Sequence, residues 1–144
     1  MLAQVLTVGA KSSPQVNIDL TGKASFIVDG DTFDVTVANG TEYRIRLADV
    51  NASEKGQVGY GEAWNYLESL VYGKTVYLDV DGVYVYDYGG RGDSLMCFVY
   101  VEYNSTHFLN VNQALLQAGK VEVKDYDDEF NPYIWNLHFK AGNT

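Results

Sequence analysis

The sequence predicts an α+β domain, mainly β, built as a five-stranded OB-type Greek-key barrel with two or three helices. Three observations support this fold class: alternating apolar runs separated by turn dipeptides, an amphipathic helix after the third run, and a second, capped helix after the last one. A chain of 144 residues with 47% hydrophobic content is most simply one globular domain. Five strands with a helix between the third and fourth follow the order of an OB-type barrel.

The first three strands form a predicted meander. Ser25-Phe26-Ile27-Val28 runs into the turn dipeptide Asp29-Gly30, and Phe33 to Val37 then alternates apolar and polar residues. Asn39-Gly40 is a second hairpin signal, after which Tyr43 to Leu47 continues as the third strand. With a period of two residues, the two arginines of the third strand project from one face of the sheet.

Two helices and the remaining strands follow. The segment Glu62 to Val71 places apolar residues at three/four spacing and predicts a helix, with a glycine just beyond it as a stop. Strands are expected at Thr75 to Val80, Val83 to Tyr86 and Leu95 to Glu102. Asn110 to Gly119 is a short helix, with asparagine before it and glycine after it.

The two ends of the chain are less regular in pattern. Residues 1–22 are interpreted as a leader or an additional edge strand, and residues 23–144 as the barrel domain. Ile134 to Phe139 is expected to be a final short helix or an edge strand. The longest apolar runs are too short to span a membrane, so no membrane partner is predicted. Abundant tyrosine and scarce lysine favour an extracellular or cell-envelope setting.

The charge balance constrains any function that involves phosphate. A net charge of −9 repels a polyanion at long range, so activity on nucleic acid requires a bound divalent cation to offset the local repulsion. The chain contains only three arginines, Arg44, Arg46 and Arg91, beside seven lysines. Arginine offers a planar, permanently charged fork that lysine does not reproduce at a bidentate phosphate site.

Oxygen-bearing residues gather at one predicted end of the meander. Asp31 follows the first tight turn, and Asn51 and Glu54 lie in the loop that leaves the third strand. Asp31, Asn51 and a carbonyl at Ala52, completed by water, would form an oxygen-only shell suited to calcium or magnesium. The alternative interpretation is that these are ordinary turn residues, since Asp, Asn and Gly dominate turns.

The arginines also allow two readings. Arg46 could bind phosphate or pair with Glu42 or Glu54 on a solvated face, and Arg91 could pair with a nearby aspartate. Glycines flank Arg91 in Gly89-Gly90-Arg91-Gly92, which allows a ligand to approach the backbone closely.

Four segments in register resemble the staphylococcal nuclease (thermonuclease) family. They are Asp29-Gly30-Asp31-Thr32, the stretch from Arg46-Leu47 to Glu54, the loop Asp87 to Gly92, and the run from Val111-Asn112-Gln113 to Gly119. The order and spacing agree from about Ala24 to Val123. The resemblance implies an OB barrel and a calcium-dependent phosphodiesterase that hydrolyses DNA, RNA or both.

The resemblance also implies roles for individual residues. Asp31 matches the calcium-binding aspartate, Glu54 the glutamate that positions or activates the attacking water, and Arg46 and Arg91 the two arginines that bind the scissile phosphate and its transition state. The chain departs from the family pattern at Asn51, where a second calcium-binding aspartate is usual.

Further departures support a second hypothesis. Ala52-Ser53 replaces a threonine-proline pair, the base-stacking tyrosines have no clear match around Tyr126, and the net charge is acidic. Cation affinity should fall when an amide replaces a carboxylate. The alternative function is therefore a catalytically weak or inactive module of the same fold that binds protein or nucleic acid.

Overall fold

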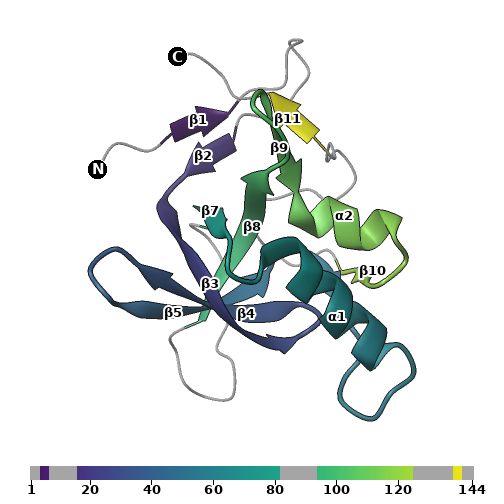
Figure 1. Cartoon of the computed structure of the whole chain (residues 1–144). Helices are drawn as coiled ribbons and strands as arrows, with labels where there is room; N and C mark the ends of the chain where they lie inside the picture. Colours follow the sequence, from purple (N-terminus) through teal and green to yellow (C-terminus); the bar gives the residue numbers. More distant parts are fainter. Residues whose placement is uncertain (1–3, 7–15, 82–93, 125–137, 141–144) are drawn as a thin grey trace.

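The barrel predicted from the sequence is present. The computed structural model describes residues 4–6, 16–81, 94–124 and 138–140 (Figure 1). Five strands close on themselves in the order β8-β5-β4-β3-β7 and back to β8; the β5–β8 pair is parallel and the other pairs are antiparallel. Their bounds are β3 Leu20–Asp29, β4 Thr32–Val37, β5 Glu42–Leu47, β7 Thr75–Val80 and β8 Ser94–Glu102.

Both predicted hairpins of the meander are confirmed. The β3–β4 hairpin turns at Gly30, and the Asp31 backbone N–H donates to Asp29 Oδ1 at 3.1 Å, a local bond that fixes such a turn. A Cβ at Gly30 would lie 2.5 Å from the Cβ of Ala63 and 2.9 Å from that of Ala52. The turn therefore needs glycine because a helix and a loop pack directly against it.

Two helices cover one end of the barrel. α1 (Tyr60–Val71) begins slightly before the predicted start, buries Ala63, Leu67 and Val71, and packs on β3. α2 (Val111–Gln117) begins after Asn110, whose side chain accepts from the backbone N–H of Gln113 as an N-cap. The two helices also contact each other.

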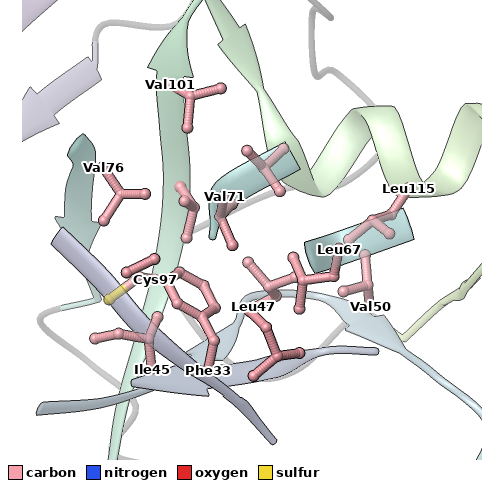
Figure 2. Packing of buried hydrophobic residues seen from close by; sticks show 14 of the residues in the cluster. Phe33, Ile45, Leu47, Val50, Leu67, Val71, Val76, Cys97, Val101 and Leu115 are labelled. Carbon is pink, nitrogen blue, oxygen red and sulfur yellow. The ribbon is translucent and has the colours of Figure 1, made fainter. Parts of the chain in front are cut away.

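The core lies inside the barrel and under these helices. Figure 2 shows residues from the strands, such as Phe33 and Ile45, meeting Leu67 and Val71 of α1 and Leu115 of α2. All five side chains are fully buried. Cys97, the single cysteine, is free and buried within the same cluster, in keeping with a small hydrophobic residue.

Asn112 joins α2 to the barrel through buried hydrogen bonds. Its Oδ1 accepts from the backbone N–H of Val99 at 3.1 Å, and its Nδ2 donates to the carbonyls of Ala48 at 2.9 Å and Cys97 at 3.2 Å. Ala48 directly follows β5 and begins the loop that leads to β6. One side chain thus ties a helix, a central strand and that loop together.

The structure adds short paired strands beside the barrel. They are β1 (Gln4–Leu6) with β2 (Val16–Ile18), β6 (Val50–Asn51) with β10 (Glu122–Val123), and β9 (His107–Asn110) with β11 (His138–Lys140). β1 and β2 lie in the stretch interpreted as a leader or an additional edge strand. β11 is an edge strand of the main sheet and overlaps the short helix or edge strand expected at Ile134 to Phe139, of which residues 134–137 lie outside the described part of the chain. β3 begins at Leu20, inside the stretch interpreted as a leader or edge strand. The strand expected at 83–86 lies outside the described residues. Within the described parts, no helix is long and apolar enough to cross a membrane.

Candidate active site at the rim of the barrel

Asp31 stands at the rim of the barrel with both carboxylate oxygens engaged. It is only 5% exposed. Oδ1 accepts a hydrogen bond from Thr32 Oγ1 at 2.8 Å, and Oδ2 accepts one from the backbone N–H of Ala52 at 2.8 Å. The second bond spans 21 residues of sequence and fastens the β3–β4 turn to the loop after β6. The side chain is therefore held in one orientation before any ligand arrives.

Arg46 reaches the same place from the end of β5. Its Nη2 lies 3.3 Å from Asp31 Oδ2 and 3.4 Å from Asn51 Oδ1, and its Nη1 donates to the Leu47 carbonyl at 2.7 Å. The side chain is 3% exposed. Among the described residues its carboxylate partner is the buried Asp31 at the rim, so pairing with Glu42 or Glu54 on a solvated face is wrong. Arg44, two residues earlier, pairs instead with Asp34 at 2.8 Å.

Asn51 and Ala52 are placed by a two-strand pairing. In β6, Asn51 stands opposite Glu122 of β10, and Val50 stands opposite Val123. The backbone N–H of Lys124 also donates to the Asp49 carbonyl at 2.9 Å, which extends the pairing past the strand. The segment after α2 thus supports the loop that carries two of the predicted metal-binding residues.

Glu54 lies a few residues farther along the same loop and is exposed. Its backbone N–H donates to Gln57 Oε1 at 2.7 Å, and its carbonyl accepts from the backbone N–H of Gln57 at 2.9 Å. The loop is further braced by Ser53 Oγ, which donates to the Val58 carbonyl at 2.8 Å. The carboxylate is thus carried on a fixed backbone and is open to solvent.

The structure brings Asp31, Arg46, Asn51 and Ala52 together, and places Glu54 two residues beyond Ala52. Arg91 and its flanking glycines lie outside the described residues, as does Tyr126. The role of Arg91 therefore stays a prediction.

Asp29 is a titratable neighbour whose importance the sequence analysis did not identify. Burial, together with the hydrogen bond and the charge of Asp31, raises its pKa from 3.8 to about 7. Desolvation disfavours the charged carboxylate, and a second carboxylate nearby adds to the effect. Two aspartates separated by one residue in a tight turn could have indicated that their carboxylates interact. The sequence analysis singled out only the second of them, Asp31, as a functional residue.

The donor set fits a hard cation. Asp31 offers a carboxylate, Asn51 an amide oxygen and Ala52 a backbone carbonyl, the oxygen types that calcium and magnesium prefer. Within the described residues, no group of three or more His, Cys, Asp or Glu side chains is arranged to hold a metal ion. A softer metal such as zinc, which takes Cys and His ligands, has no comparable set there.

A polar pocket of about 370 Å³ adjoins these residues. Asn51, Ala52 and Ser53 form one side of it, residues of the loop after Glu54 and the start of α1 form another, and the segment 119–122 after α2 closes it. Figure 1 shows α1, α2 and β10 meeting in this region. Lys120 Nζ lies 3.4 Å from Glu62 Oε2 at the pocket wall.

Comparison with known proteins gives relatives over most of the chain, although no family model matches. The chain is 30% identical over 141 residues to a protein named uncharacterized endonuclease from Escherichia coli O157:H7, covering 86% of this chain and 90% of that protein. The same values apply to a protein of that name from Escherichia coli. A micrococcal nuclease of Shigella flexneri is 33% identical over 103 residues, which is 70% of this chain and 56% of that protein.

Proposed function

The chain belongs to the staphylococcal nuclease family, and from this premise we propose that it is a metal-dependent nuclease that hydrolyses phosphodiester bonds of DNA, RNA or both. The observation that carries the proposal is the position of Arg46. Its guanidinium lies 3.3 Å from Asp31 and 3.4 Å from Asn51, so the carboxylate proposed to bind a cation and the guanidinium proposed to bind phosphate share one place at the rim.

We propose that Asp31, Asn51 and the carbonyl of Ala52 hold a divalent cation, and that calcium is the cation used. When bound, such an ion polarises a phosphate oxygen and withdraws charge from it. The chain's own contribution is to fix the ligands in advance. The Asp31 carboxylate is oriented by the Thr32 hydroxyl and the Ala52 backbone N–H, so little reorganisation is required on binding.

Glu54 is proposed to align or deprotonate the attacking water. An exposed carboxylate on a braced loop can accept a proton from water while remaining in reach of solvent. Arg46 is proposed to stabilise the negative charge that builds on the phosphate oxygens during in-line attack. Arg91 is proposed for the same task from the loop that lies outside the described residues.

Cleavage assays on single-stranded DNA and RNA, with calcium or with a chelator, test this function. Glu54→Gln and Arg46→Lys are each expected to lower the rate about 10²- to 10³-fold, because removing one stabilising donor typically has that effect. Arg44→Lys is the matched control for Arg46→Lys, since it is the same change on the same strand in an ion pair with Asp34. Its rate should be unchanged. Cleavage that persists in the chelator, or is equal in all variants, would refute the proposal.

A second candidate function is favoured by Asn51. An amide at the position where the resembling family carries a second aspartate lowers the negative charge offered to a cation. On this reading the fold is a module that binds nucleic acid or protein with little or no hydrolysis. Binding of single-stranded DNA by the purified protein, without cleavage at saturating calcium, would favour the module. Calcium-dependent cleavage lost in Glu54→Gln would exclude it.

A further inference from the structure

The pocket beside the candidate active site has the size of a small ligand site. Its volume of about 370 Å³ lies near the lower end for small-molecule sites, roughly 300–1,000 Å³, which suits one nucleoside and not a longer segment of chain. It shares Asn51 and Ala52 with the proposed metal site. A nucleotide next to a phosphate held there would therefore meet the mouth of the pocket.

The charged side chains on the pocket wall disfavour phosphate as its occupant. Two carboxylates, Glu62 and Glu122, line the pocket against one cation, Lys120. That cation is paired with Glu62 Oε2 at 3.4 Å, and the other oxygen, Oε1, makes no hydrogen bond within the described part of the chain. A wall with an excess of carboxylate oxygens repels an anion and accepts hydrogen bonds from neutral N–H donors.

The pocket is also connected to the loop that carries the proposed catalytic carboxylate. Gln57 lines the pocket, and its Oε1 accepts from the backbone N–H of Glu54 at 2.7 Å. The Ser53–Val58 hydrogen bond holds the same loop closed on itself at 2.8 Å. A ligand that contacts Gln57 would therefore act on the hydrogen bond that holds the backbone of Glu54 in place.

We propose that this pocket is a base-recognition subsite that takes an unpaired nucleobase bearing an exocyclic amino group, namely adenine, cytosine or guanine, and disfavours thymine and uracil. The inference rests on the proposed nuclease function and specifies its substrate. Carboxylate oxygens accept from an exocyclic amino group, and an amide such as Gln57 can donate to the unprotonated ring nitrogen beside it, whereas the N3–H of thymine or uracil lies between two carbonyl oxygens that a carboxylate repels. A base enters such a pocket only when it has left the duplex stack, so the preferred substrate is single-stranded.

Nucleoside titration tests the subsite without phosphate or metal. Amide resonances are followed by two-dimensional NMR in chelator while deoxyadenosine, deoxycytidine or thymidine is added. The two amino-bearing nucleosides should shift the amides of Gln57, Gly59 and Lys120, and thymidine should bind about tenfold more weakly. The double variant Glu62→Gln/Glu122→Gln should lose most of this preference. Glu68→Gln, on the same helix but away from the pocket wall, is the matched control and should keep it.

Equal binding of thymidine, shifts confined to other residues, or no binding of any nucleoside would overturn the subsite. This readout requires neither Arg46 nor hydrolysis, so it can fail while the nuclease assay succeeds, and the reverse also holds. A second readout uses cleavage of single-stranded oligomers of adenine or thymine. The ratio of kcat/KM for the two oligomers should fall about tenfold in the double variant and remain unchanged in Glu68→Gln. An unchanged ratio in the double variant would also overturn the proposal.

Discussion

Asn112→Ala should destabilise the protein severely, because this one side chain makes three buried hydrogen bonds to the backbone. The change leaves the backbone N–H of Val99 and the carbonyl of Ala48 without the hydrogen bonds that Asn112 makes. The carbonyl of Cys97 also loses a bond to Asn112, but it still accepts one from the backbone N–H of Ala48 at 2.8 Å. Each buried backbone group left without a partner costs about 1–3 kcal/mol, so the expected loss for the two groups is about 2–6 kcal/mol. That is a large share of the roughly 5–15 kcal/mol typical of a folded domain.

Urea unfolding followed by tryptophan fluorescence measures this loss through the midpoint and the slope of the transition. Asn112→Leu fills the space but forms no hydrogen bond, so it should be nearly as unstable as Asn112→Ala. Asn65→Ala, an exposed position on α1, is the control and should change stability by less than about 1 kcal/mol. A loss below about 1 kcal/mol in Asn112→Ala, or full recovery in Asn112→Leu, would show that volume and not hydrogen bonding holds α2 to the barrel.

Three further changes test other parts of the site. Gly30→Ala places a Cβ within 2.5 Å of α1 and should lower stability by about 1–3 kcal/mol in thermal unfolding, whereas Gly61→Ala, where a Cβ meets nothing within 4 Å, should not be destabilising. In chelator, the free energy of unfolding should fall as pH rises from about 4 to 7. Folding raises the pKa of Asp29 from 3.8 to about 7, so over this range the unfolded chain loses the proton more readily than the folded protein does. Asp29→Asn should flatten the profile by up to about 2 kcal/mol, and an unchanged profile would refute this assignment. Asn51→Asp should raise calcium affinity about tenfold in calorimetry, since it adds a carboxylate beside the first ligand; the same gain in Asn65→Asp would show only a general charge effect.

Local patterns predicted the elements whose signals lie within a few residues of sequence. The turn at Asp29-Gly30, the alternation along β4 and β5, and the apolar spacing of α1 are each short-range, and each is confirmed. β6 and β10 were missed because each has only two residues, too few to show a period. Their pairing joins Asn51 to Glu122, and no local pattern encodes a contact over that separation.

The candidate site was predicted as a set of residues but not as a set of contacts. The meander topology brings Asp31 to the loop after β5, which is why Asn51 and Ala52 lie beside it. The sequence did not reveal that Arg46 would be buried against Asp31, because period two gives only the face of a strand and not the depth of a side chain. The pKa of Asp29 depends on the same unseen burial.

The acidic surface and the rim site act over different distances. A net charge of −9 repels a nucleic acid mainly through its long-range field, and salt screens that field over roughly 10 Å at 0.1 M. The contact between Arg46 and Asp31, at 3.3 Å and buried, lies well inside this distance and is screened far less. Long-range repulsion therefore weakens as ionic strength rises while the geometry of the site remains. The proposed binding of phosphate at Arg46 is therefore compatible with an acidic chain, provided that the oxygen ligands proposed beside it also hold a cation.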